Sequence, residues 1–375
     1  MQQNTTQPSD PQTEDWLRLC LVSGVGPRIL TELIDRFETP GAVIAATAAQ
    51  LQQVDGVGHR LAQGIVEAKD KIDPTIELAT CHQNDIQVLT RSADAYPRLL
   101  REIPDPPGIL FFQGTLKPAD ALAIAVVGSR NATRYGVTQA QRIATGLAQA
   151  GITVVAGLAR GIDAAAHRAA LAAGGRTLAV MGGGVLKMYP PEHAELAGEI
   201  REQGCLISEM PPNYVATRHA FPRRNRIISG LTLGTLVVEA AERSGALITA
   251  RQAMEQNRDV FAIPGPVDSR NAKGCHALLR DGAVLVESVD DILDALGPLA
   301  EENKREDGRA IRHPAELQLN SNETSVLQAI GSEPTLIDQI VQQTELPTQR
   351  VLSTLSVLEV RKLISRLPGG CVARR

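Results

Sequence analysis

The middle of the chain alternates between short apolar runs and segments with apolar residues at helical spacing. The runs are ALAIAVVG, ITVVAG, TLAVMGG, CLISEM, TLVVEA, DVFAIPG and AVLVES, and segments such as GVTQAQRIATGLAQAG and ALITARQAMEQN separate them. Near-continuous apolar strands are typical of a parallel sheet with helices on both faces, because neither side of such a strand meets water. The pattern therefore predicts an α/β domain, an extended Rossmann-like doubly wound parallel sheet, over residues 118–297.

The N-terminal region contains an internal repeat. VSGVGPRILTELIDRF (22–37) and VDGVGHRLAQGIVEAK (54–69) share the pattern V-x-G-V-G-x-R, followed by apolar residues at helical spacing. This repeat predicts a tandem helix-hairpin-helix, or SAM-like, module over residues 1–80. The hairpin N–H groups could hold a phosphate, or the hairpins could serve packing alone. Residues 1–118 hold 10 Lys+Arg and 15 Asp+Glu, which favours packing or an interaction with another protein.

The remaining segments complete the order of domains. Residues 81–117 are expected to connect the helical module to the sheet, and residues 298–315 are charged and poor in apolar residues, which predicts a linker. After it, NETSVLQAIG, TLIDQIVQQT and PTQRVLSTLSVLEVRKL have helical patterns, and ISRLPGGCVARR is typical of two strands around a Pro-Gly-Gly turn. Three helices and a β-wing predict a winged-helix domain over residues 316–375.

Composition narrows the class of protein only a little. The 375 residues carry 38 Lys+Arg and 42 Asp+Glu, so a case for nucleic-acid binding must rest on local clusters. Five cysteines lie far apart without a C-x-x-C pair, which suits a reducing cytoplasm and predicts no metal site. The N-terminus has no pattern of a signal peptide, and the sequence has no apolar run of about 18 residues that would predict a membrane span.

The candidate binding residues follow the predicted strands. Ligands of an open α/β sheet bind beyond the carboxyl ends of its strands. There the sequence places glycines, which allow close approach of a ligand, together with hydroxyl and cationic groups suited to phosphate. The residues are Gly128, Ser129, Arg130, Gly157, Gly161, Lys187, Phe221, Arg224, Asn225, Arg226, Ser244 and Gly245.

The segment FPRRNRIISGL (221–231) concentrates positive charge. We expect it to be a loop that runs into a helix, with its arginines projecting into the ligand cleft. Ile227, Ile228 and Leu231 would anchor the segment in the core.

Common cofactor motifs and a catalytic set are missing from these loops. Gly128 is followed by Ser129-Arg130-Asn131, so the dinucleotide fingerprint G-x-G-x-x-G does not occur there, and the sequence has no Walker motif. No nucleophile, base and orienting residue can be assembled, so no catalytic residue and no cofactor are predicted. Dispersed phosphate contacts beside Phe221, a rare aromatic residue, form the combination that single-stranded nucleic acid requires.

These motifs resemble one family closely. G-S-R, G-L-A-x-G-I-D-x-x-A-H, Y-P-P-E-H, F-P-x-R-N-R-I-I-S-G-L and V-V-E-A-x-x-x-S-G-A-L-I-T-A are similar to the DNA-processing protein A family (DprA, also called Smf). The resemblance implies a bacterial cytoplasmic homodimer without established enzymatic activity. It would bind single-stranded DNA in its Rossmann domain, protect DNA that enters during natural transformation, and help to load the RecA recombinase.

The resemblance also implies roles for the matching positions. Gly128, Ser129 and Arg130 would contact the DNA backbone, and Phe221, Arg224, Asn225 and Arg226 would line the same pocket. Ala156, Leu186 and His276 depart from the family pattern, where Ser, Asp and Asn are usual. None of these three belongs to the arginine cluster.

Two other functions stay open at this point. GLTLGTLVVEA (230–240) loosely resembles a loop of the cytokinin-activating phosphoribohydrolases, with Glu239 as the acid, although their Pro-Gly-Gly is missing. The chain could instead be a winged-helix transcription regulator whose Rossmann domain senses a metabolite. The terminal 60 residues carry 6 Lys+Arg and 6 Asp+Glu, so their net charge favours neither interpretation.

Overall fold

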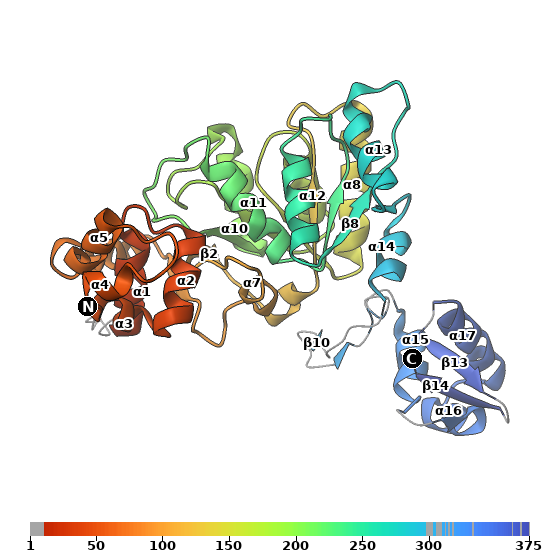
Figure 1. Cartoon of the computed structure of the whole chain (residues 1–375). Coiled ribbons are helices and arrows are strands. Elements are labelled where there is room, and N and C mark those ends of the chain that lie inside the picture. The colour runs from red at the N-terminus through yellow and green to blue at the C-terminus, as the bar shows by residue number, and fades with distance from the viewer. Residues whose placement is uncertain are drawn as a thin grey trace, which may run out of the picture.

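The structure is a computed structural model. It describes residues 11–297, 303–304, 310–311, 313, 316, 319–331, 334–361, 363–367 and 370–374. Figure 1 shows a helical N-terminal module at one end, an α/β domain in the middle, and a small helical unit with a β-sheet at the C-terminus. Among the described residues, no helix combines the length and the apolar character needed to cross a membrane.

The N-terminal module contains the two predicted hairpins. Its helices are α1 (Pro11–Leu21), α2 (Pro27–Phe37), α3 (Pro40–Ala45), α4 (Ala48–Leu51), α5 (His59–Lys71) and α6 (Pro74–Gln83). Gly24 and Gly56 turn the hairpins at φ +96° and +80°, a region that favours glycine, and α2 and α5 begin directly afterwards. Arg28 of the first hairpin pairs with Asp55 of the second at 3.1 Å.

The module packs directly on the α/β domain. Leu17 of α1 is buried with Phe111 of the sheet, and the Trp16 indole Nε1 donates to Ser92 Oγ at 3.1 Å. A Cβ on Gly108 would lie 2.8 Å from the Trp16 ring, so the small residue permits the close approach.

The central sheet has nine strands in the order β1-β2-β6-β5-β4-β3-β7-β8-β9. The strands are β1 (Gln87–Thr90), β2 (Ile109–Gly114), β3 (Ala123–Val127), β4 (Thr153–Ala156), β5 (Thr177–Val180), β6 (Cys205–Ser208), β7 (Gly234–Val237), β8 (Asp259–Ala262) and β9 (Val284–Leu285). Strands β3 to β9 are parallel, as expected. β1 and β2 are antiparallel and lie within residues 81–117, so the expected connecting segment adds an edge to the sheet.

Helices cover both faces of the sheet. They are α7 (Arg98–Arg101), α8 (Arg134–Gln149), α9 (Ile162–Ala172), α10 (Ala194–Gln203), α11 (Ala220–Gly230), α12 (Ala246–Glu255), α13 (Lys273–Arg280) and α14 (Val289–Leu296), with 3₁₀ turns η1 (Pro118–Ala121), η2 (Pro191–His193) and η3 (Arg270–Ala272). Along β3, Ala123, Ala125 and Val127 join one core cluster, and Ile124 and Val126 join the other. This division explains the unbroken apolar runs in the sequence.

The C-terminal unit has the predicted winged-helix elements. They are α15 (Ser321–Gln328), β12 (Thr335–Leu336), α16 (Ile337–Thr344), α17 (Thr348–Val360), β13 (Ile364–Leu367) and β14 (Cys371–Arg374). The strands form a sheet in the order β12-β14-β13. Val326, Leu355 and Val372 belong to a core of their own. In the predicted linker, β10 (Asn303–Lys304) pairs with β11 (Ala310–Ile311).

The order of the strands creates a switch point. From β3 the chain adds β4, β5 and β6 on one side, and then returns to place β7 on the other side of β3. The loops that leave β3 and β7 therefore diverge, which opens a crevice at the carboxyl ends of these strands.

Candidate nucleic-acid interface

A cleft of about 960 Å³ lies at this switch point. Its lining includes Ser129 and Arg130 from the loop after β3, Ser244 and Gly245 from the loop after β7, and Phe221 from α11. Two acidic residues, Asp163 and Glu242, also line it. The six cationic residues in the lining are Arg130, Arg218, Arg224, Arg243, Arg270 and Lys273. The cleft is therefore positively charged although the chain as a whole carries a net charge of −4.

Arg130 and Phe221 form the most distinctive feature of the cleft. The guanidinium carbon of Arg130 lies 5.2 Å from the centroid of the Phe221 ring, within the range of a cation–π contact. The Tyr189 ring is 5.5 Å from the Phe221 ring on the centroids and is tilted by 52°. An exposed cation beside two aromatic rings can contact a phosphate and a base at the same time.

The helix α11 differs from the expectation. It begins at Ala220, so FPRRNRIISGL is helical from its first residue and does not start as a loop. Ile227, Ile228 and Leu231 are buried, as expected. Because an α-helix turns about 100° per residue, three arginines at 223, 224 and 226 cannot all face one cleft.

Arg224 forms part of the floor of the cleft. Its side chain is 4% exposed, and its Nη1 donates to the carbonyl oxygens of Gly157 and Val180. Burial lowers the pKa of Arg224 to about 10, which still leaves it charged at neutral pH. Burial raises the pKa of the nearby Asp163 carboxyl, while Arg224 and the N–H groups of Gly157 and Ala159 act in the opposite direction. Arg224 is therefore held by the protein itself and has limited freedom to follow a ligand.

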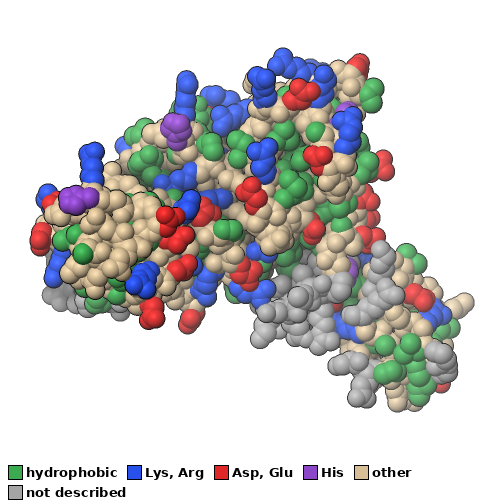
Figure 2. Space-filling view, viewed as in Figure 1, with side chains coloured by type: hydrophobic (Ala, Val, Ile, Leu, Met, Phe, Trp, Pro, Cys, Tyr) green, Lys and Arg blue, Asp and Glu red, His purple; other side chains and the backbone are tan. Residues whose placement is uncertain are grey.

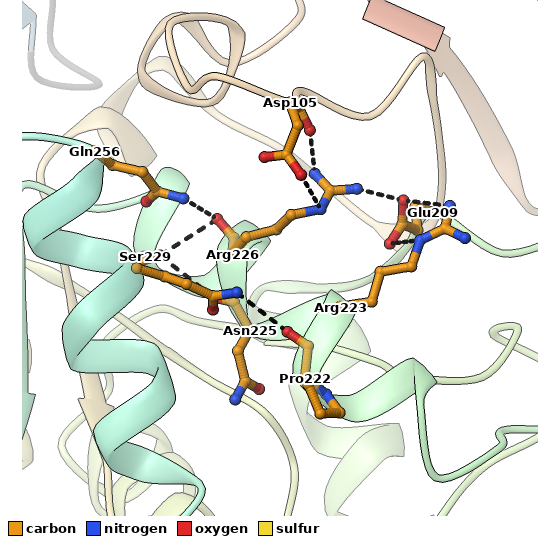
Figure 3. A network of polar contacts seen from close by, with 9 residues as sticks. Asp105, Glu209, Pro222, Arg223, Asn225, Arg226, Ser229 and Gln256 are labelled. Atoms are coloured by element: carbon orange, nitrogen blue, oxygen red, sulfur yellow. Dashed lines mark hydrogen bonds and ion pairs between the residues drawn. The ribbon is translucent and has the colours of Figure 1, made fainter. Parts of the chain in front are cut away.

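Arg226 does not line the cleft, which corrects the expectation. Figure 3 shows its guanidinium between Asp105 and Glu209. Nη2 lies 2.6 Å from Glu209 Oε2, and Nε lies 3.3 Å from Asp105 Oδ2. Arg223 reaches the same Glu209 with Nε and Nη2, both at 3.0 Å. These two arginines fix α11 against its surroundings, and neither of them lines the cleft.

Most of the other predicted residues line the cleft, and three do not. Gly128, Ser129, Arg130, Phe221, Asn225, Ser244 and Gly245 line the cleft together with Arg224. Gly157, Gly161 and Lys187 are not among the lining residues. A Cβ on Gly157 would lie 2.6 Å from the Arg224 Cζ atom, so this glycine makes room for a side chain of the protein.

Sequence reasoning missed four contributors to the charge of the cleft. Arg218, Arg243, Arg270 and Lys273 line it. Arg218 stands beside the arginine cluster, and Arg243 directly precedes Ser244, so their positions were available as signals. Arg270 and Lys273 follow β8, and only the strand order places the end of β8 next to β7.

Glu239, the acid of the phosphoribohydrolase alternative, has a structural position. It is 5% exposed and does not line the cleft. Its Oε1 accepts from the Thr133 hydroxyl at 2.7 Å, and its Oε2 accepts from the Thr133 N–H at 2.8 Å. Both carboxylate oxygens are therefore occupied in holding the start of α8, and the geometry gives no support to Glu239 as a general acid.

The two histidines of the motifs are packed in the interior. His167 is fully buried, with its Nδ1 2.7 Å from Thr177 Oγ1, and burial lowers its pKa to about 3. His193 Nδ1 lies 3.0 Å from the Leu158 carbonyl oxygen. Among the described residues, no group of three or more His, Cys, Asp or Glu could hold a metal ion.

Comparison with known proteins decides the family. The family model for DNA recombination-mediator protein A matches residues 87–297, more than half of the chain. The chain belongs to this family. Models for a DprA winged-helix domain and a SAM-like helix-hairpin-helix tandem match residues 310–370 and 17–69, in agreement with the two flanking units.

Relatives of this recombination-mediator family cover almost the whole chain. Protein Smf of Synechocystis is 36% identical over 96% of this chain and 98% of its own length. Protein Smf of Escherichia coli is 37% identical over 97% and 96%. The X-ray structure of DprA from Streptococcus pneumoniae matches 74% of this chain and 96% of its own, with a TM-score of 0.66 and 35% identity.

One solved relative is described by its ligand. The structure of DNA processing protein A from Helicobacter pylori concerns its mode of binding single-stranded DNA. It covers 56% of this chain and 95% of its own, with a TM-score of 0.51 and 25% identity.

Proposed function

We propose that this chain binds single-stranded DNA in the cleft at the β3–β7 switch point. The observation that carries the proposal is Arg130 over the Phe221 ring in a cleft lined by six cationic residues. A phosphate can pair with the cations, and a base can reach Phe221 only when it is not stacked inside a duplex. Membership in the recombination-mediator family and the binding of single-stranded DNA by the Helicobacter pylori protein support this ligand.

The contacts proposed for the cleft are sequence-independent. Arg130, Arg243, Arg270 and Lys273 are exposed and would pair with phosphates. Ser244 and the backbone at the start of α12 would add hydrogen-bond donors. Pairing with phosphates and stacking on an aromatic ring read no base edge, so we expect little preference among sequences.

The proposed role in the cell is that of a mediator of recombination. The chain would protect incoming single-stranded DNA during transformation and help RecA to assemble on it. We further propose that the chain acts in the cytoplasm, as a homodimer, without catalysing a reaction. Sedimentation at micromolar concentration should show the dimer, and RecA should assemble on a labelled strand sooner when the chain is present. A monomer throughout, or unchanged RecA assembly, would remove the corresponding part of the proposal.

The experiment that tests the cleft compares substitutions of two cationic cleft residues with a control substitution outside the cleft. Lys273 begins α13 and lines the cleft, whereas Arg280 ends α13 outside it. Arg130→Ala and Lys273→Ala should each weaken binding of a labelled single strand by roughly tenfold at moderate salt. Each should also make the salt dependence shallower by about 0.7 for every phosphate that the variant no longer neutralises. Arg280→Ala is the matched control and should bind as the unmodified chain does.

Fluorescence anisotropy with single-stranded and duplex oligonucleotides across a salt series measures these effects. Equal affinity for both forms, or equal loss in all three variants, would contradict the proposal. Release of free base from a nucleoside monophosphate would instead bring back the phosphoribohydrolase alternative.

A further inference from the structure

Two exposed tyrosines stand out in a chain with few aromatic residues. The sequence holds one Trp, four Tyr and five Phe, and all ten lie in the described part of the chain. Tyr135 and Tyr189 are the two exposed ones among them, at 41% and 48%. Exposed aromatic rings lose the stabilisation of burial, so two of them beside a cationic cleft require an explanation.

Tyr189 and the hydrogen-bond partner of Tyr135 lie in loops on opposite sides of β3 and β7. Tyr189 lines it from the loop that follows β5. Tyr135 belongs to the first turn of α8, and its hydroxyl donates to the Pro264 carbonyl oxygen at 2.7 Å, in the loop that follows β8. The strand order between these loops is β5-β4-β3-β7-β8, four spacings of about 4.8 Å, or roughly 19 Å. The cleft lies between them, at β3 and β7.

Both rings are held in place by contacts with the protein. The hydrogen bond to Pro264 ties Tyr135 down by its hydroxyl, and its ring stays partly exposed. Tyr189 is held by packing against the Phe221 ring, with the ring centroids 5.5 Å apart. A ring that is fixed before a ligand arrives costs little conformational entropy when a base stacks on it.

Positive charge continues as far as the Tyr135 side. Arg270 and Lys273 follow β8 and line the cleft, and the exposed Arg134 is adjacent to Tyr135 in sequence. Figure 2 shows Lys and Arg side chains gathered over the region of α12 and α13. The combination of a cationic path and separated aromatic platforms suits an extended single strand.

We propose that the single strand runs across the carboxyl ends of the strands from Tyr189 to Tyr135, with bases stacked on both rings. Tyr135 is then a second base platform outside the cleft, and it sets the length of strand that the chain covers. This inference rests on the proposed function, because it assumes that single-stranded DNA occupies the cleft.

The test uses a series of labelled oligothymidylates from about 4 to 16 nucleotides. Affinity of the full chain should rise with length until the strand reaches both tyrosines, and then level off. Tyr135→Leu should lower the affinity for long strands by about tenfold and leave that for the shortest strands unchanged. Tyr135→Phe keeps the ring and should stay within about threefold of the unmodified chain. Tyr214→Leu is a control, because Tyr214 does not line the cleft.

A spectroscopic readout separates stacking from a structural effect. Tyr135→Trp adds an exposed indole to a chain whose single Trp16 is 2% exposed in the N-terminal module. Its fluorescence should be quenched by long strands and not by the shortest ones that bind. Urea denaturation of each variant would show whether the fold is retained.

The outcomes distinguish the two proposals. If the unmodified chain does not prefer single strands, the proposed function fails. If it does, but Tyr135→Leu binds long strands normally and the Tyr135→Trp signal is unchanged, only the second platform fails. If Tyr135→Leu lowers the affinity for short and long strands equally, Tyr135 is a structural support of the cleft, and the inference is also overturned.

Discussion

The arginines of α11 show how differently three identical side chains in one short segment are used. Arg224 is buried under the cleft, and Arg223 and Arg226 converge on Glu209 on another side of the helix. Glu209 follows β6, and Asp105 precedes β2, so this cluster joins the helix to two distant parts of the chain. Arg226 therefore contributes to the stability of the fold, and the exposed Arg130 is the better candidate for a DNA contact.

Arg226→Ala should mainly lower stability. It would remove the partner of Asp105 and leave the buried Glu209 with Arg223 alone, and removal of one member of a buried ion pair costs about 3 kcal/mol of the free energy of unfolding. Arg223→Ala is the control, because its side chain is 38% exposed and its loss should cost no more than about 1 kcal/mol. Urea denaturation measures both variants. If the two substitutions lower the free energy of unfolding equally, the proposed distinction between the two arginines would be wrong.

The buried His167 makes stability depend on pH. The folded chain keeps this imidazole neutral down to a pKa of about 3, because burial disfavours the charged form, whereas the unfolded chain protonates it near 6.5. Its contribution is therefore complete above pH 6.5 and is lost as the pH falls towards 3. His167→Gln should make the decline between these values shallower by up to about 1.4 kcal/mol per pH unit. If the free energy of unfolding falls equally steeply with decreasing pH in His167→Gln and in the unmodified chain, this role of His167 would be refuted.

At the scale of elements, the hairpins of the N-terminal module are fixed by their glycines. In the first hairpin, Gly24 has φ +96°, and a Cβ there would lie 3.2 Å from Leu61 Cδ1. Gly26, two residues later, is the N-cap of α2 at φ −85°, with open space where a Cβ would be. Arg28, one of the cations near these hairpins, is paired with Asp55. This arrangement favours a role of the hairpins in packing over a role in phosphate binding.

The two glycines of this hairpin provide a matched pair of substitutions. Gly24→Ala should lower the free energy of unfolding by about 1–3 kcal/mol, because alanine rarely adopts a positive φ. Gly26→Ala should change it by less than about 1 kcal/mol, since its conformation is open to any residue. Thermal or urea denaturation distinguishes them. A Gly26→Ala variant that is as unstable as Gly24→Ala would show that the φ angle is not the cause.

At the scale of the whole molecule, the winged-helix unit has its own core, separate from the α/β clusters. Its helix α17 exposes Leu352, Val357 and Val360 and contains a single basic residue, Arg350. A helix that reads duplex DNA normally presents several cationic or amide side chains to the major groove. This surface therefore gives little support to the alternative of a transcription regulator.

A chain that ends at residue 297 should bind single-stranded DNA within about twofold of the full chain. The cleft is built wholly from residues 127–273, and a separate core allows the winged-helix unit to be removed without opening the α/β domain. Anisotropy with the same labelled strand checks this expectation. A tenfold loss would show that the winged-helix unit takes part in binding. Sequence-specific duplex binding by residues 316–375 alone would revive the regulator.

The sequence alone determined most of the elements and their order. Apolar runs predicted β3 to β9 because both faces of these strands are buried, and the repeated G-V-G pattern predicted the two hairpins because a tight turn requires glycine. The loops of Gly128–Arg130 and Ser244–Gly245 were correctly placed at one sheet edge, since carboxyl ends of parallel strands meet there. The edge strands β1 and β2 were missed, because they are short and lie outside the βα alternation.

Only the tertiary structure decided which side chains face the cleft. A sequence shows that Arg224 and Arg226 are two residues apart, but the start of α11 at Ala220 and the position of Glu209 decide which way each one points. Likewise, Arg270 and Lys273 reach the cleft because β8 lies beside β7, a neighbour relation that no local pattern encodes. Local propensity fixes elements, whereas long-range packing fixes the directions of their side chains, and function depends on those directions.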